Sequence, residues 1–299
     1  MSGAADIRDN AADDAAALAA ARRDMAQRWV LVLAGGLGTR LRSVVADRPK
    51  VLALVGGQPF LDILVAQLYG HGVRRIGLLL GHLHQQVQAH VDKVLRLRFP
   101  DVEFALSVEP GPLGTAGALR HAGALVQGSG GSAGTALLMN GDTFVEFDPA
   151  AVFAIHRSSG ASVTMAVQHV ADISRFGAVE LDGHGRVLAF REKQARMGPR
   201  MERTSERWEA GPSMEQTDVV PGWINAGVYA FEPALLDLIA QDRAVSLESE
   251  VFPGLLAAGA HVQSAPQRGY FVDFGTPASY AEFEAYLAAR ASAANAAQP

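Results

Sequence analysis

The stretch WVLVLAGGLGTRLRSVVADRPK, which ends at Lys50, constrains the fold of this chain more than any other. It starts with an uncharged apolar run, residues 29–34, and such a run predicts a buried strand of a parallel sheet. Gly35 and Gly36 end the run, and glycine lets the backbone turn sharply and approach a ligand closely. Backbone N–H groups in such a turn bind phosphate oxygens, and Arg40 and Lys50 add positive charge. The stretch therefore predicts a phosphate-binding turn; the alternative is an ordinary turn with solvated arginines.

Two common phosphate-binding motifs do not match this stretch. A P-loop ends in Gly-Lys-Ser or Gly-Lys-Thr, and no such triplet follows the glycines. The dinucleotide-binding fingerprint needs a third glycine at a fixed offset and an acidic residue at the end of a following strand, and GGLGTR meets neither requirement. A P-loop kinase is therefore disfavoured.

Length and composition indicate a globular protein with a substantial core. The 299 residues are enough for one large α/β domain or two small ones, and 49% of them are hydrophobic. The formal net charge of −5 gives no support to nucleic-acid binding as a main role. Cysteine is absent, which excludes disulfides and thiolate metal sites and suits a reducing compartment.

The first 27 residues are rich in Ala, Asp and Arg, and we expect them to form a flexible extension. Asp13, Asp14 and Asp24 interrupt any apolar stretch, so the segment does not have the pattern of a signal peptide. No apolar run in the chain approaches the length that spans a bilayer. We therefore expect a cytoplasmic protein that does not contact membranes.

Strand and helix patterns alternate along the first half of the chain. The predicted strands cover residues 29–34, 74–81, 102–109 and 135–142. Amphipathic stretches between them predict helices. This alternation predicts a Rossmann-like α/β fold, with a mostly parallel central sheet flanked by helices on both faces.

The second half of the chain has a different pattern. Predicted strands joined by short links begin near residue 161, which indicates a mixed sheet attached to the first one. The stretch 194–222 has no clear period, and we expect a long mobile loop there. We predict a single domain over residues 28–293, with a boundary between its two halves near residue 158.

Two aspartates stand out because each ends an otherwise apolar strand: Asp142 in MNGDTF and Asp273 in YFVDFG. Buried carboxylates need a partner or a cation. Two of them on one rim of a sheet suit Mg²⁺, with phosphates and water completing the oxygen shell. The alternative for each is a capping or turn aspartate. His82, His84 and His90 lack the spacing of a metal site on one helical face, and we expect them to be surface residues.

A second segment of small residues, LGTAGAL, opens a predicted helix shortly after Glu109. Small residues at a helix start let a flat ligand lie on the backbone, with amide donors facing it. The alternative is close packing of the helix against the sheet.

The motifs LAGGLGTRLR, PK, LGTAGAL, NGD, FREK, INAGVY and DFGTP resemble, in this order, the signatures of the sugar-phosphate nucleotidyltransferases. The resemblance covers roughly residues 30–288. It implies an enzyme that makes an NDP-sugar from an NTP and a sugar 1-phosphate. Within the family the chain most resembles the D-glycero-α-D-manno-heptose 1-phosphate guanylyltransferases, which use GTP, and the mannose-1-phosphate enzymes come close behind. The product of such an enzyme feeds a bacterial surface polysaccharide.

The resemblance also assigns roles to individual residues. The half before residue 158 would bind the nucleotide, through Leu33, Ala34, Gly35, Gly36, Gly38, Thr39, Glu109, Gly114 and Thr115. Charge on the phosphates would be neutralised by Arg40, Lys50 and Lys193. The half from residue 159 would hold the sugar, through Gly177, Glu192 and Asn225. Mg²⁺ would be bound by Asp142 and Asp273.

Chemistry gives one argument for the choice of base. Guanine presents N1–H and an exocyclic amine, a donor pair that a carboxylate accepts bidentately. Glu109 precedes the base segment and is the candidate acceptor. The alternative is a surface acid at the end of a strand.

Other functions stay open at this point. The second hypothesis is the same reaction on mannose, glucose or an amino sugar 1-phosphate, with GTP, dTTP or UTP. A catalytically silent NDP-sugar-binding regulatory subunit is a different class, but relatives of that kind lose the Arg, Lys or acidic residues present here. No C-terminal β-helical or second catalytic domain follows, so we expect no allosteric control through one. Relatives often form dimers or tetramers, and a homo-oligomer stays open.

Overall fold

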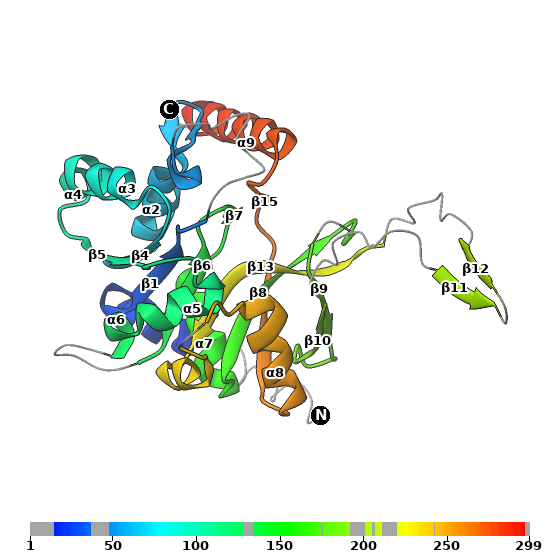
Figure 1. Cartoon of the computed structure of the whole chain (residues 1–299). Helices are drawn as coiled ribbons and strands as arrows, with labels where there is room; N and C mark the ends of the chain where they lie inside the picture. Colours follow the sequence, from blue (N-terminus) through cyan, green and yellow to red (C-terminus); the bar gives the residue numbers. More distant parts are fainter. Residues whose placement is uncertain are drawn as a thin grey trace, which may run out of the picture.

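A computed structural model describes residues 15–36, 48–127, 134–174, 176–191, 201–204, 207–210, 220–241 and 243–296. A nine-stranded sheet forms its centre (Figure 1). The strands of the first half are β1 (Trp29–Leu33), β4 (Arg75–Leu80), β5 (Glu103–Val108) and β6 (Ala136–Asn140). They run parallel in the order β6-β1-β4-β5. The predicted mostly parallel α/β sheet is confirmed for this half.

The second half extends the same sheet with mainly antiparallel pairs. Its strands are β8 (Val163–Val170), β9 (Ala178–Leu181), β10 (Val187–Arg191), β13 (Gly222–Phe231) and β14 (Val262–Gln267). Strand β13 joins the two halves, because it pairs antiparallel with β6 on one side and with β8 and β9 on the other. Strand β14 returns parallel to β8. This arrangement is the mixed sheet predicted from the sequence.

Helices cover both faces of the sheet. The longer ones are α2 (Phe60–Gly70), α3 (His84–His90), α5 (Gly114–His121), α7 (Pro149–Ser159) and α9 (Pro277–Ala296). Shorter elements are η1 (Met25–Gln27), η3 (Lys50–Leu52), η4 (Val91–Leu95), α4 (Arg96–Arg98), α6 (Gly123–Gln127), η5 (Pro233–Leu238), η6 (Leu247–Val251) and α8 (Phe252–Ala257). In the part of the chain that the structure describes, no helix is long and apolar enough to cross a membrane.

Alternate residues of β1 face two hydrophobic cores, one on each side of the sheet. Val30 and Val32 belong to the core covered by α2, α3, α7 and α9. Leu31 belongs to the core covered by α5, α6 and α8. All three residues are fully buried, as expected for a parallel strand with helices on both faces.

The predicted flexible extension is partly a packed helix. Residues 15–24 are helical and continue into η1. Ala21 and Met25 are buried in the first core, and Leu18 packs against it. The spacing of these three residues places them on one helical face, which explains the docking. Residues 1–14 lie outside the described part of the chain.

The stretch predicted as a mobile loop contains a hairpin. Strands β11 (Met201–Thr204) and β12 (Arg207–Ala210) pair antiparallel, with Met201 opposite Ala210. In Figure 1 this hairpin is drawn apart from the central sheet. Backbone pairing between two short segments explains the difference, because such segments are too short to show a reliable period. The other residues of 192–219 lie outside the described ranges.

Candidate active site

A cleft of about 1140 Å³ opens at the carboxyl ends of β1, β4, β5 and β6. Open α/β sheets bind ligands at this edge. Twelve of the residues predicted from the sequence line it: Leu33, Ala34, Gly35, Gly36, Lys50, Glu109, Gly114, Thr115, Asp142, Gly177, Asn225 and Asp273. The other five predicted residues lie outside the described part of the chain: Gly38, Thr39, Arg40, Glu192 and Lys193.

A short two-stranded ribbon brings the two predicted metal ligands together. Strands β7 (Thr143–Val145) and β15 (Phe271–Asp273) pair antiparallel, with Asp273 opposite Thr143. The backbone N–H of Phe274 donates to the carbonyl of Asp142 at 2.9 Å. Asp142 and Asp273, 131 positions apart in sequence, are therefore neighbours on the wall of the cleft.

Helix α9 follows β15 and contacts this ribbon (Figure 1). Glu146, just after β7, accepts hydrogen bonds from the Tyr270 N–H at 3.0 Å and from the Tyr286 hydroxyl of α9. Burial on its own raises the pKa of Glu146, but these hydrogen bonds outweigh it and the pKa is lowered. Arg290, 2.5 Å away, adds to the lowering. The aspartates thus stand on a ribbon that the last helix fixes.

Lys50 points its ammonium group at the first of these acids. Its Nζ lies 2.8 Å from Oδ2 of Asp142. The lysine side chain is 11% exposed, whereas the aspartate is 43% exposed. Pro49 sets φ before η3, and Val51 is buried, so the lysine stem leaves a fixed backbone. One end of the cleft therefore carries a positioned cation beside two carboxylates.

The donor set at this end fits Mg²⁺. Two aspartates offer hard oxygen ligands, which Mg²⁺ prefers together with substrate phosphates and water. No group of three His, Cys, Asp or Glu side chains with metal-site geometry exists among the residues that the structure describes. A protein-only cage is thus absent from that part of the chain, and a site shared with phosphate fits the two carboxylates.

The glycine turn combines packing with access. A Cβ on Gly35 would lie 3.0 Å from Oε1 of Glu109 and 3.1 Å from the backbone N of Gly81, so this glycine lets two strand ends approach closely. A Cβ on Gly36 would meet no atom within 4 Å, so this position is open. The turn therefore leaves space for a ligand to approach the backbone at Gly36, whereas Gly35 allows the strand ends to pack tightly.

The small residues that open α5 mainly serve packing. The N–H groups of Ala116 and Gly117 donate to the carbonyl of Val245, at 3.0 and 3.3 Å. Gly114 has φ +73°, and a Cβ there would lie 2.5 Å from the same oxygen. For these amides the prediction of donors facing a ligand is wrong, and close packing is what the structure shows. Thr115 still lines the cleft.

The wall of the cleft that carries Gly177 and Asn225 is built at an irregularity in β13. The N–H of Asn225 donates to the carbonyl of Gly177 at 3.1 Å. The Asn225 side chain accepts from the N–H of Gly227 at 2.9 Å and donates to the Tyr229 hydroxyl at 2.6 Å. Gly227 has φ +73°, and the register of β13 against β8 shifts here. The irregularity turns Asn225 toward the cleft and fixes its amide.

Several lining residues were missed from the sequence. His82 and His84 line the cleft, because they follow the end of β4; His82 is exposed, as predicted, and His84 is partly buried. The rule that ligands bind at strand ends would have found them. Ser246 and Glu248 also line the cleft, but no local motif places them there.

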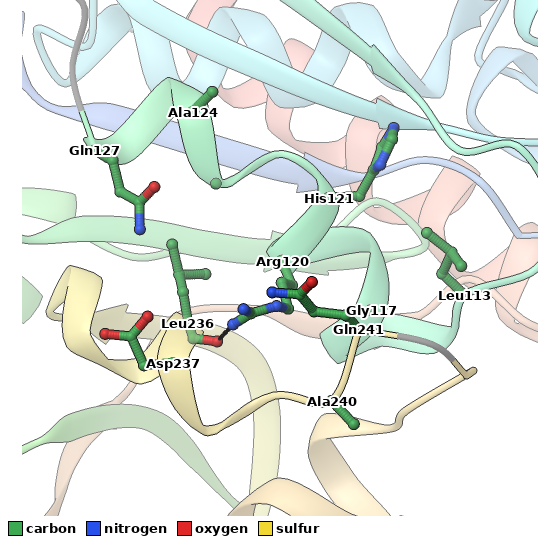
Figure 2. A pocket seen from close by; sticks show the side chains of 11 residues that line it. Leu113, Gly117, Arg120, His121, Ala124, Gln127, Leu236, Asp237, Ala240 and Gln241 are labelled. Carbon is green, nitrogen blue, oxygen red and sulfur yellow. Dashed lines mark hydrogen bonds between the residues drawn. The ribbon is translucent and has the colours of Figure 1, made fainter.

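A second cavity of about 400 Å³ lies between α5, α6 and residues 236–241 (Figure 2). Figure 2 shows Arg120 reaching from α5 to the carbonyl of Leu236. The Gln241 amide lies against the same guanidinium. None of the predicted site residues lines this cavity, so the candidate site is the first cleft.

The chain is similar in sequence to known proteins. The family model described as "Nucleotidyl transferase" matches residues 29–290. The chain is 32% identical over 263 residues to the mannose-1-phosphate guanylyltransferase of Mycobacterium tuberculosis, which covers 86% of this chain but only 64% of that protein. It is 25% identical over 256 residues to the D-glycero-alpha-D-manno-heptose 1-phosphate guanylyltransferase of Campylobacter jejuni, which covers 85% of this chain and 97% of that protein.

A solved structure has the same fold. The crystal structure of HddC from Yersinia pseudotuberculosis, complexed with GMP-PN, aligns with a TM-score of 0.65 at 27% identity. The alignment covers 85% of this chain and 97% of that one.

Proposed function

This chain belongs to the nucleotidyl transferase family, and on that premise we propose that it transfers GMP from GTP to a sugar 1-phosphate and releases pyrophosphate. The preferred acceptor in this proposal is D-glycero-α-D-manno-heptose 1-phosphate, which gives GDP-heptose for surface polysaccharide synthesis. The heptose enzyme of Campylobacter jejuni supports this choice, since it matches over nearly its whole length.

One observation carries the proposal: Lys50, Asp142 and Asp273 meet at one end of the cleft, with 2.8 Å between Lys50 Nζ and Asp142 Oδ2. Triphosphate and sugar phosphate are both anionic, and bringing them together requires positive charge. Lys50 supplies one such charge at a fixed place. Arg40 and Lys193 would supply two more in this proposal.

The reaction needs positioning more than proton transfer. A phosphate oxygen of the sugar 1-phosphate attacks the α-phosphorus of GTP, and the bond to the pyrophosphate oxygen breaks in line. The attacking oxygen is already ionised, so no side chain has to act as a general base. Lys50 orients and neutralises phosphate oxygens, and such electrostatic placement is the main source of catalysis in phosphoryl and nucleotidyl transfer.

Asp142 and Asp273 would hold Mg²⁺, which neutralises charge on the phosphates when bound. Their adjacency on the β7–β15 ribbon supports this assignment.

The other end of the cleft would take the sugar and the base. Gly177, Asn225 and Glu192 would contact sugar hydroxyls, and the fixed amide of Asn225 supports that role. Glu109, Gly114 and Thr115 would surround guanine.

Mannose 1-phosphate is the second candidate acceptor. The 32% identity with the mannose-1-phosphate guanylyltransferase of Mycobacterium tuberculosis favours it. A non-catalytic NDP-sugar-binding subunit is disfavoured, because the lysine and both aspartates are present and lie together.

The test is pyrophosphate release with Mg²⁺ across a matrix of five nucleotides and four acceptors. The nucleotides are GTP, ATP, CTP, UTP and dTTP; the acceptors are heptose, mannose, glucose and N-acetylated sugar 1-phosphates. The strongest activity is expected with GTP and D-glycero-α-D-manno-heptose 1-phosphate. Strong activity in another cell of the matrix would keep the reaction and replace the substrate. No activity in any cell, with NDP-sugar still bound, would favour the regulatory subunit.

A further inference from the structure

A carboxylate that no sequence motif singled out holds the start of α5. Thr115 donates its hydroxyl to Oε2 of Glu248 at 2.7 Å, and the same hydroxyl accepts from the N–H of Leu247 at 2.8 Å. Ser246 donates its hydroxyl to the same Oε2 at 3.0 Å. Thr115, Ser246 and Glu248 all line the cleft. One oxygen of Glu248 is thus fixed by two hydroxyls on the cleft wall.

Backbone contacts lock the two segments into one wall. The N–H of Val245 donates to the carbonyl of Leu113 at 2.8 Å, and the Val245 carbonyl accepts from the first turn of α5. Gly114 leaves no room for a Cβ between these segments. The backbone that leads into Glu248 therefore cannot move away from the start of α5 without breaking these contacts.

The other acid at this end, Glu109, is bound differently. Its Oε2 accepts from the N–H of Leu113 at 3.1 Å. Its Oε1 lies 3.0 and 2.4 Å from the positions that Cβ atoms would take on Gly35 and Gly81, so it is wedged between two backbone segments. Within the described residues, neither this oxygen nor Oε1 of Glu248 has a hydrogen-bond partner. Because Oε1 of Glu109 lies against Gly35 and Gly81, Glu248 is the acid better placed to offer an acceptor to a ligand.

We propose that Glu248 is a specificity-determining residue, whose Oε1 accepts a hydrogen bond from the exocyclic amine of guanine while Oε2 holds Thr115. The inference rests on the proposed function, because it presumes that GTP occupies the cleft. A carboxylate suits guanine, whose Watson–Crick edge presents two donors, and opposes adenine, which presents an acceptor at N1. In this proposal Glu109 packs against the glycine turn at Gly35, and Glu248 selects the base.

The experiment compares GTP with ITP, which lacks only the exocyclic amine. The wild-type enzyme should show a kcat/KM for GTP about tenfold or more above that for ITP, as expected for one hydrogen bond to a charged acceptor. In Glu248→Gln the carbonyl oxygen keeps Thr115 and Ser246, and the amide nitrogen presents a donor to the base. The GTP-to-ITP ratio should fall to within about twofold of unity, with an unchanged KM for the sugar 1-phosphate.

Glu250→Gln is the matched control. Glu250 lies two residues further along η6 and pairs with Arg243 at 2.5 Å, but it does not line the cleft. It should keep the wild-type ratio. A wild-type ratio near unity, or an unchanged ratio in Glu248→Gln, would overturn the role of Glu248 and leave GTP transfer intact. Absence of turnover of either nucleotide in the wild-type enzyme would instead overturn the proposed function on which the inference rests.

Discussion

Strand β6 has a polar cluster at each end, and the two clusters differ in what their groups face. At the carboxyl end, Asp142 pairs with Lys50 and is 43% exposed on a large cleft. At the other end, His156 is 2% exposed and contacts Thr164 at 2.9 Å and Glu232 at 3.3 Å. The first cluster faces the cleft, whereas the second closes around the buried ring of His156, with Glu232 at its rim 48% exposed.

The two ends of β6 differ in whether their buried polar groups have hydrogen-bond partners. Thr135, just before β6, completes the closed cluster by donating to Glu232 at 2.5 Å. At the open end, Oδ1 of Asn140, a cleft-lining residue, is buried without a hydrogen-bond partner in the described residues. Buried polar groups are costly when unpaired. The difference teaches that the closed cluster serves stability, whereas the open end retains polar groups for a ligand to satisfy.

Removing charge from the open end should have the largest effect on turnover. Lys50→Ala and Asp273→Ala should each lower kcat by about a hundredfold or more, because Lys50 balances phosphate charge directly and Asp273 would hold the Mg²⁺ that does so. Stability should change little for Lys50→Ala, since its partner Asp142 is partly solvated. Pyrophosphate release and thermal unfolding measure the two effects. Near-normal release by either variant would remove that residue from the mechanism.

Breaking the closed cluster should lower stability and leave turnover nearly unchanged. Thr164→Val removes the hydroxyl that faces Nδ1 of His156 and leaves a buried ring nitrogen without that partner. The expected cost is about 1–3 kcal/mol of unfolding free energy, with kcat unchanged within about twofold. Denaturant unfolding and steady-state kinetics measure the two quantities. A large loss of kcat in a folded Thr164→Val protein would contradict the division between the two ends.

Protonation of His156 in the closed cluster should lower the unfolding free energy as pH falls. Burial lowers the pKa of His156 below its ordinary value of 6.5, and the nearby Glu232 only partly opposes this. The unfolded chain then binds the proton more readily, so stability is fully present above pH 6.5 and decreases as pH falls from there toward the lower folded pKa. The loss is at most about 1.4 kcal/mol per pH unit.

The variant His156→Gln tests this prediction directly, because it removes the titration of His156 and leaves the other titratable groups in place. Unfolding free energies at pH 7.5 and 5.5 should differ less in the variant than in the wild-type protein. An equal pH dependence in both proteins would show that His156 does not titrate differently on folding.

Much of the open end was predictable because its residues follow one rule. Asp142 follows β6, and the strand pattern alone places such ends on one edge of a parallel sheet. Asp273 also ends an apolar strand, but that strand, β15, lies outside the parallel sheet. The neighbouring position of these two acids also needs the β7–β15 pairing, which is non-local. Glu248 was not predictable, because its link to Thr115 spans 133 positions and leaves no local signature.

The fold, too, has features that local sequence patterns predict and features that they do not. The parallel strands were predictable from uninterrupted apolar runs, whereas the docked helix at residues 15–24 depends on a partner surface that sequence does not display. Burial of Ala21 and Met25 is a tertiary effect. Local patterns therefore predict elements, and long-range contacts decide which segments pack.

The most direct test of direct nucleotidyl transfer at the open end is exchange of labelled pyrophosphate into GTP. If the sugar phosphate attacks GTP in a single displacement, exchange requires a sugar 1-phosphate and Mg²⁺, and Asp273→Asn abolishes it. The wild-type enzyme should show no exchange when the sugar 1-phosphate is omitted. Rapid exchange without it would reveal a nucleotidyl-enzyme intermediate and contradict the proposed mechanism.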